Sequence, residues 1–156
     1  MLTSRKILIV EDHRDLLDLL GEALGLLGWE TLLAESGREA MNKLEDDLPS
    51  VVFLDLGTPL INGIELAASL KAHPVYKDIP ILAAGGHSGD LIRKLCLAAG
   101  CDDFISKPLV FAELEMRLNN LWSLVRRKNI SAGEPVNLAS DGWNLNAHGG
   151  GRRKVA

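Results

Sequence analysis

Short apolar runs that stop abruptly at a charged or turn-forming residue recur along this chain of 156 residues. Four or five apolar residues in a row, bounded by turn residues, are typical of a buried strand in a parallel sheet, because helices cover both faces of such a sheet. Between the runs lie segments in which apolar residues recur every three or four positions, the pattern of an amphipathic helix. This alternation predicts a parallel sheet with helices on both faces and right-handed crossovers.

Turn and capping residues mark the ends of five expected strands and five expected helices. The expected strands are Lys6–Val10, Glu30–Ala34, Val51–Leu54, Ile79–Ala83 and Asp103–Ser106. The first four helices are expected over about 14–27, from a capping box at 36–39, over about 63–72, and over about 88–99. A buried stripe defines the fifth helix: Phe111, Leu114, Leu118, Leu121 and Val125. The order predicts five consecutive βα units.

Charged side chains stand where three of the apolar runs stop. Glu11 and Asp12 follow the first run, Asp55 follows the third, and Lys107 follows the fifth. The carboxyl ends of parallel strands lie at one edge of the sheet, where ligands of open α/β sheets bind. We therefore expect three carboxylates and one ammonium group to meet there.

That set of groups suits the transfer of a phosphoryl group to an aspartate. A carboxylate is ionised at neutral pH, so it needs no base to act as a nucleophile, but it repels an anionic phosphoryl group. Mg²⁺ binds hard oxygen ligands and neutralises this charge. A lysine adds a compact positive charge for a phosphoryl oxygen.

Three segments, "ILIVED", "VVFLDLGTPLINGIEL" and "AAGCDDFISKP", resemble response-regulator receiver domains in order and spacing, over roughly residues 4–125. The resemblance implies a flavodoxin-like (βα)5 fold of three layers with strand order 2-1-3-4-5. It implies that Asp55 accepts a phosphoryl group from a sensor histidine kinase or a phosphotransfer protein. It also implies that Mg²⁺ is held by Asp12, Asp55 and the backbone carbonyl of Gly57, and by Glu11 through a water molecule.

The resemblance implies further roles, with two departures. Lys107 would pair with the phosphoryl group, and Pro108 would follow a cis peptide bond. Gly85 stands where the family usually has a Thr or Ser, so it offers the phosphoryl group only its backbone N–H. Phe104 fills a switch position that often holds Tyr. We therefore expect phosphorylation chemistry with an altered readout.

Two smaller questions concern single residues of the same region. Thr58 would either position its loop or assist at the phosphoryl group. The histidines His13, His73 and His87 show no metal-ligand spacing and are expected at the surface.

The composition points to a cytoplasmic chain. No apolar run reaches about 18 residues, so no membrane span is expected, and the first residues lack the pattern of an export signal. Cys96 and Cys101 form no CxxC motif and are expected to be reduced and buried.

Charge divides the chain into an acidic body and a basic tail. Residues 1–125 contain 11 Lys and Arg against 19 Asp and Glu, and residues 126–156 contain 6 against 2. We expect a receiver domain over 4–125 and a basic linker or tail over 126–156. The alternating pattern of the tail fits either the β-hairpin that opens a winged-helix domain or an unstructured segment. Neither contains a recognition helix, so sequence-specific DNA binding is not expected.

The expected activity is signalling, with catalysis limited to the domain's own phosphorylation and dephosphorylation. The resemblance implies partner contact or homodimerisation through the face of helix four, strand five and helix five. The polar residues of that face are Arg93, Lys94, Asp102, Asp103 and Arg117, for which an ordinary charged exterior is the alternative. One rival function is a receiver-like binding module that works without phosphorylation, which Gly85 favours. The other is a haloacid-dehalogenase-like phosphatase, which Gly57 disfavours because it stands where the second acid is needed.

Overall fold

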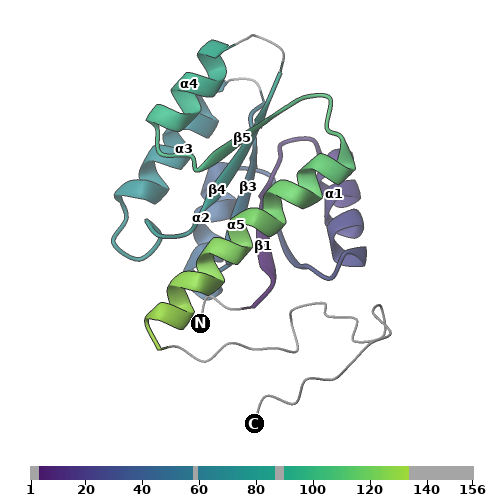
Figure 1. The fold of residues 1–156 in the computed structure, drawn as a ribbon. Helices are drawn as coiled ribbons and strands as arrows, with labels where there is room; N and C mark the ends of the chain where they lie inside the picture. The colour runs from purple at the N-terminus through teal and green to yellow at the C-terminus, as the bar shows by residue number, and fades with distance from the viewer. Residues whose placement is uncertain (1–3, 58–59, 87–89, 134–156) are drawn as a thin grey trace.

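Strands and helices alternate along the whole described part of this computed structural model, which covers residues 4–57, 60–86 and 90–133 (Figure 1). The strands are β1 (Lys6–Val10), β2 (Glu30–Ala34), β3 (Val51–Asp55), β4 (Ile81–Gly85) and β5 (Asp103–Ser106). The helices are α1 (Arg14–Leu26), α2 (Gly37–Asp46), α3 (Leu60–Ala72), α4 (Asp90–Ala98) and α5 (Phe111–Ser131).

The strands form one parallel sheet in the order β2-β1-β3-β4-β5. This order confirms the flavodoxin-like fold. The chain leaves β1 toward β2 on one side and returns to β3 on the other, so the direction of winding changes between β1 and β3. Ligand sites of open α/β sheets lie beyond the carboxyl ends of the strands at such a change.

Two apolar layers pack against opposite faces of the sheet. Alternate residues of β3 point to opposite sides, so Val52 and Leu54 belong to the apolar layer that includes residues of α2, α3 and α4, whereas Val51 and Phe53 belong to the layer that includes residues of α1 and α5. Figure 1 shows α5 crossing in front of the sheet. All five residues of β3 are buried, which explains why its sequence is apolar up to the terminal acid.

Two elements begin at other residues than the sequence predicts. Strand β4 starts at Ile81 instead of Ile79, because Pro80 has no N–H for the ladder and Ile79 closes a turn onto the carbonyl of Tyr76 at 3.0 Å. The same shift brings Gly85 into the strand. Helix α3 starts at Leu60 instead of Gly63.

The fifth helix is longer than its apolar stripe predicts. The stripe from Leu114 to Val125 is buried as expected, but Phe111 is 38% exposed, so its assignment to the core is wrong. The helix continues to Ser131, so the first residues of the expected tail are helical. Residues 134–156, and with them both interpretations of the tail, lie outside the described residues.

An aromatic and cationic cluster packs against the helix at the end of its apolar stripe. Trp122 meets Trp29 edge to face at 6.1 Å between ring centroids. The guanidinium groups of Arg5 and Arg126 lie 5.2 and 5.0 Å from the Trp122 ring. Arg126 therefore packs against the molecule with its guanidinium group over the Trp122 ring. Because arginine is charged, the apolar pattern of the helix does not predict this contact.

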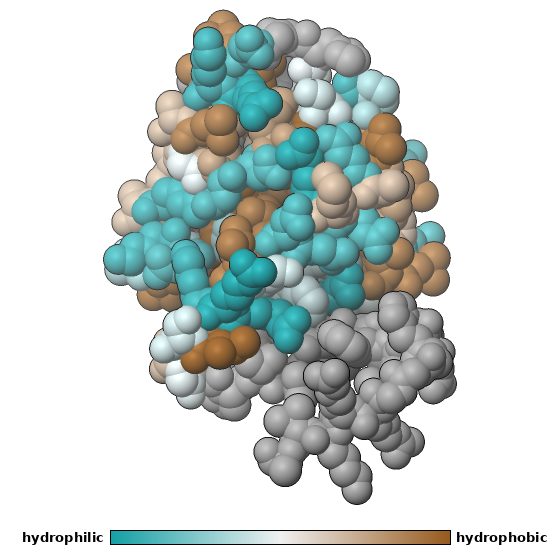
Figure 2. All heavy atoms as spheres, viewed as in Figure 1, coloured by the Kyte–Doolittle hydropathy of each residue, from teal (hydrophilic) through white to brown (hydrophobic). Residues whose placement is uncertain are grey.

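Polar residues dominate the face shown in Figure 2, with apolar atoms visible between them. Within the described ranges, no helix combines the length and the apolar character that crossing a membrane requires. Cys96 and Cys101 are both buried and form no disulfide, as expected.

Candidate functional site

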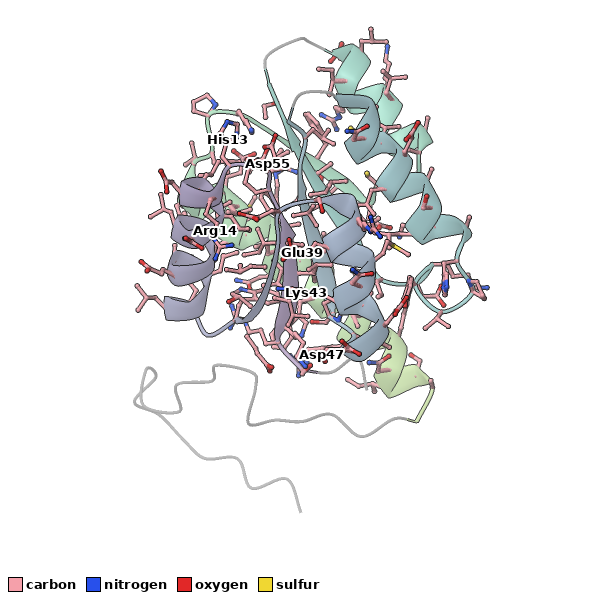
Figure 3. All side chains as sticks on the ribbon, turned by 180° about the vertical axis from the view of Figure 1, so that it is seen from behind. His13, Arg14, Glu39, Lys43, Asp47 and Asp55 are labelled. Carbon is pink, nitrogen blue, oxygen red and sulfur yellow. The ribbon has the colours of Figure 1, made fainter. Side chains whose placement is uncertain are left out.

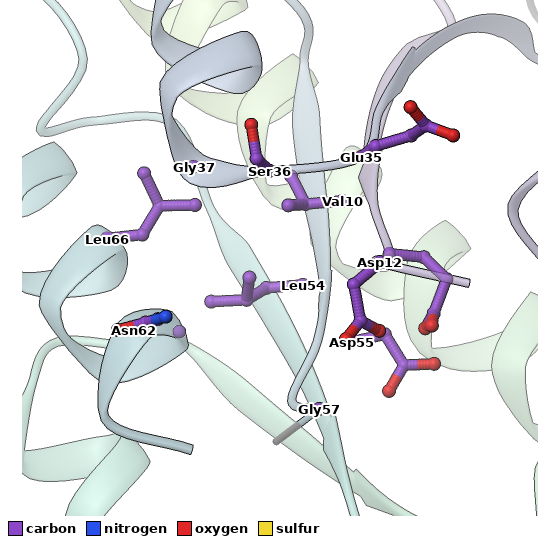
Figure 4. A pocket seen from close by; sticks show the side chains of 12 residues that line it. Val10, Asp12, Glu35, Ser36, Gly37, Leu54, Asp55, Gly57, Asn62 and Leu66 are labelled. Atoms are coloured by element: carbon purple, nitrogen blue, oxygen red, sulfur yellow. The ribbon is translucent and has the colours of Figure 1, made fainter. Parts of the chain in front are cut away.

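The carboxyl ends of β1 and β3 bring three acids together at the change of winding. Glu11 and Asp12 directly follow β1, and Asp55 is the last residue of β3. They line a cavity of about 150 Å³ that α3 closes from the other side with Asn62 and Leu66 (Figure 4). The carboxylates at the ends of the two apolar strands thus lie together around one cavity.

Asp55 is the most enclosed of these acids. Its side chain has no exposed surface, and the ammonium of Lys107 lies 2.5 Å from Oδ1. Within the described residues, neither of its carboxylate oxygens accepts a hydrogen bond that satisfies the usual geometry. A buried carboxylate is costly unless other groups compensate its charge, so Asp55 relies on this one ion pair.

Glu11 is 2% exposed and lines the same cavity as Asp55. Its Oε1 accepts a hydrogen bond from the backbone N–H of His13 at 3.0 Å, whereas its Oε2 is buried without a partner in the described structure. Burial raises the pKa of Glu11 to about 7, and interaction with Asp55 adds to this rise. Interaction with Glu11 in turn lowers the pKa of the more exposed Asp12. The pKa of Glu11 therefore reflects both its burial and the negative charge of its neighbours.

The donor set fits a hard divalent cation. Glu11 and Asp55 present buried carboxylate oxygens without hydrogen-bond partners, and the side chain of Asp12 is 49% exposed at the mouth of the cavity. A Cβ atom added to Gly57 would lie 2.9 Å from Asp12 Oδ1, so only a residue without a side chain lets the backbone approach this carboxylate. Carboxylate and carbonyl oxygens are the ligands that Mg²⁺ prefers.

The remaining expected residues lie around this edge, with one exception. Lys107 follows β5, and its peptide bond to Pro108 is cis, as the resemblance implies. Gly57 and Gly85 both line the adjoining cavity together with Lys107. Thr58 lies outside the described residues, as do His87 and Ser88, where the fourth helix was expected to start.

The Phe104 ring packs directly against the backbone of Gly85. A Cβ atom added to Gly85 would lie 3.0 Å from Cζ of Phe104 and 3.2 Å from Cγ2 of Ile92. The Phe104 ring is only 6% exposed. The ring therefore fills the space that a side chain at position 85 would need.

Two residues of the site were not predicted from the sequence. His13 is exposed as expected, yet its Nδ1 lies 3.1 Å from both Glu11 Oε1 and Asp12 Oδ1, and Figure 3 shows it above Asp55. The position of His13, directly after two acids and at the start of a helix, was the sequence feature that could have predicted this contact. Asn62 gave no signal, because its place opposite the acids depends on how α3 packs.

The raised pKa of Glu11 predicts a pH-dependent stability difference. A folded-state pKa of about 7 against an ordinary 4.5 means that this group's stabilising contribution is complete below pH 4.5 and is lost as the pH rises through 7. In EDTA, Glu11→Gln should melt close to the wild type at pH 4.5 and at a higher temperature at pH 8. Calorimetry at both pH values tests this, with the exposed Glu45→Gln on α2 as control. An equal difference at both pH values would contradict it.

Comparisons with known proteins agree with this geometry. Residues 7–119 match the model of the family described as response regulator receiver domain. The chain is 33% identical over 130 residues to the transcriptional regulatory protein PrrA of Mycobacterium tuberculosis, covering 83% of this chain and 54% of PrrA. It is 37% identical over 119 residues to the phosphate regulon transcriptional regulatory protein PhoB of Pseudomonas aeruginosa, covering 75% and 51%. The chain thus spans about half the length of these curated relatives.

Among solved structures, the signal receiver domain of a signal transduction histidine kinase from Syntrophus aciditrophicus superposes with a TM-score of 0.73 at 31% identity. This match covers 80% of the present chain and 94% of the other. A CheY-like receiver domain protein from Methanospirillum hungatei matches with a TM-score of 0.71 at 25% identity, covering 80% and 98%.

Proposed function

This chain belongs to the family of response regulator receiver domains of two-component systems, and on that premise we propose that Asp55 accepts a phosphoryl group from a sensor histidine kinase or a phosphotransfer protein. The observation that supports this most directly is the state of Asp55. Its carboxylate is fully buried, pairs with Lys107 through one oxygen only, and lies beside Glu11 and Asp12 at the ligand-binding edge of the sheet.

The proposed step forms one bond and breaks one bond. A carboxylate oxygen of Asp55 attacks phosphorus in line, and the N–P bond of the phosphohistidine breaks with its electron pair going to the imidazole nitrogen. As the carboxylate charge is lost in the acyl phosphate, the ammonium of Lys107 pairs with a phosphoryl oxygen instead. Attack by water on phosphorus later breaks the bond between the Asp55 oxygen and phosphorus, which releases inorganic phosphate and restores the carboxylate.

Magnesium is the cofactor that we propose for this step. Asp12, Asp55 and the backbone carbonyl of Gly57 would hold it, with Glu11 acting through a water molecule. When bound, Mg²⁺ neutralises charge on the phosphoryl group. The neighbouring acids Glu11, Asp12 and Asp55 would otherwise repel the phosphodonor.

Labelling of the chain tests the proposal. Incubation with ³²P-labelled acetyl phosphate and Mg²⁺ should label the protein, and excess EDTA should lower the initial rate about tenfold or more. Label that survives alkali or hydroxylamine, or labelling that is equally fast in EDTA, would contradict an acyl phosphate formed with magnesium.

We further propose that the signal leaves through the face of α4, β5 and α5. Leu91 and Leu95 expose 65% and 42% of their surface on α4. On the same face, Arg117 donates two hydrogen bonds to Asp103 at 2.9 and 3.0 Å, which holds these charges in one arrangement. The mixture of exposed apolar groups and ordered charge suits contact with a partner or with a second copy.

The contact of Gly85 with Phe104 lies between the acidic site and that face. Ile92 of α4 borders the same space beside Gly85. We expect Gly85→Ala to destabilise the protein by about 1–3 kcal/mol through overpacking. Phe104→Leu in the same chain should recover part of this loss. Urea unfolding of the single and double variants measures the coupling, which should be at least about 0.5 kcal/mol.

Gly86→Ala is the matched control for Gly85→Ala. A Cβ atom at Gly86 would have no neighbour within 4 Å, so this variant should stay close to the wild type in stability. Additive effects of Gly85→Ala and Phe104→Leu would show that the ring does not occupy the space beside Gly85.

A second candidate function is a receiver that contacts its partner without phosphorylation. The absence of a hydroxyl group at Gly85 favours it, because the family's usual hydroxyl cannot follow the phosphoryl group there. Beryllofluoride with Mg²⁺ distinguishes the two candidates: partner affinity changes if phosphorylation controls binding, and stays constant if it does not.

A further inference from the structure

His13 places a nitrogen ligand beside the two acids that follow β1. Its Nδ1 lies 3.1 Å from Glu11 Oε1 and 3.1 Å from Asp12 Oδ1. One potential ligand atom from each of these three residues lies within 4.8 Å of the other two. Three consecutive residues thus present two carboxylates and an imidazole to one point.

The imidazole of His13 contacts the two acids and does not cap α1. His13 is the N-cap residue of α1, but its side chain makes no capping hydrogen bond. Its backbone N–H instead donates to Glu11 Oε1, which fixes the turn that brings the ring back over the acids. The ring is 78% exposed, so it reaches the acids from the solvent side and does not fill the core.

The spacing of the atoms suits a coordinated ion. Metal–ligand distances of about 2.1 Å in an octahedral site give neighbouring ligand atoms a separation of about 3.0 Å. Two of the three separations already have this value. Asp12 is half exposed and free to adjust the third. Glu11 is held in place by burial. Its Oε1 already accepts the His13 N–H, whereas its buried Oε2 has no hydrogen-bond partner in the described structure and remains available to an ion.

From this geometry we propose that Glu11, Asp12 and His13 form a site for a late first-row transition-metal dication such as Ni²⁺, overlapping the proposed magnesium site. Imidazole nitrogen favours such ions over Mg²⁺, which prefers oxygen. The inference deepens the proposed function and rests on it in one respect, because it concerns the same acidic cavity. A transition-metal ion bound there would compete with magnesium for Glu11 and Asp12.

Calorimetric titration of the untagged chain tests the site directly. The wild type should bind Ni²⁺ about tenfold or more tightly than His13→Ala, whereas the two proteins should bind Mg²⁺ within about threefold of each other. His73→Ala is the matched control, because His73 stacks on Tyr76 at 4.1 Å between ring centroids, away from the three acids. It should bind Ni²⁺ as the wild type does.

A second measurement separates direct coordination from a change in charge. In NMR spectra, substoichiometric Ni²⁺ should broaden the ring signals of His13 before those of His73. His13→Gln keeps a polar side chain of similar size but lacks the imidazole, so it should lose Ni²⁺ affinity as His13→Ala does. Equal Ni²⁺ affinity in wild type and His13→Ala, or a parallel loss of Ni²⁺ and Mg²⁺ affinity, would overturn the proposal.

Asp55→Asn distinguishes failure of this inference from failure of the proposed function. The proposed nickel ligands exclude Asp55, so this variant should bind Ni²⁺ within about threefold of the wild type while losing its phosphorylation site. Nickel binding that depends on His13 in a chain that is never labelled would leave the inference standing and reject the proposed function. Labelling at Asp55 without such nickel binding would do the reverse.

Discussion

Asp55→Asn should receive no label from ³²P-labelled acetyl phosphate under conditions in which the wild type is labelled. The amide is close in size to the carboxylate, so the strand and its surroundings can stay as they are, but it is not an anionic nucleophile. It also removes a proposed magnesium ligand. The effect should therefore be a complete loss of transfer at this position, measured on the intact protein by autoradiography.

Folding and specificity need separate controls in this experiment. Asp46→Asn changes an exposed acid near the end of α2 and should be labelled like the wild type. Because the neutral amide would leave Lys107 without its anionic partner, circular dichroism of both variants should be compared with the wild type first. Undiminished labelling of a folded Asp55→Asn protein would place the phosphoryl group elsewhere.

Phe53→Ala should lower the free energy of unfolding by about 3–5 kcal/mol. Phe53 has no exposed surface and lies in the central strand, two residues before Asp55, where its ring packs between the sheet and the layer of α1 and α5. Truncation removes apolar contacts and leaves a cavity that rigid neighbouring strands cannot close. Denaturant unfolding followed by circular dichroism measures the change.

Phe111→Ala provides the same chemical change at a different depth. Phe111 is 38% exposed at the start of α5, so its truncation should cost clearly less than that of Phe53. Similar losses for the two variants would show that the layer behind β3 repacks, and that the buried ring is not the source of the stability.

Much of the fold was predictable because a buried parallel strand has few possible sequences. Runs such as Val51–Leu54 have to be apolar on both sides, and the first charged residue after them has to leave the core. For this reason Asp55 and Lys107 were found together from their positions alone, and the structure places them in contact. The strand order followed from the family resemblance and not from the apolar pattern.

The parts that were not predictable depend on contacts between distant segments. The start of β4 depends on a turn around Tyr76, and the packing of Arg126 on α5 depends on the ring of Trp122. The role of His13 depends on a side-chain direction that a sequence pattern does not contain. Each of these features requires knowledge of which surfaces meet.

The length of α5 has a mechanical consequence for any signal that starts at the acidic cavity. The helix begins a few residues after Lys107 and runs without a break for 21 residues, which is about 30 Å. A tilt of about 5° at its first turn would displace its last turn by roughly 2.5 Å. The segment after Ser131 is attached to the far end of this helix, so a tilt of the first turn that followed phosphorylation of Asp55 would reach that segment as a larger displacement.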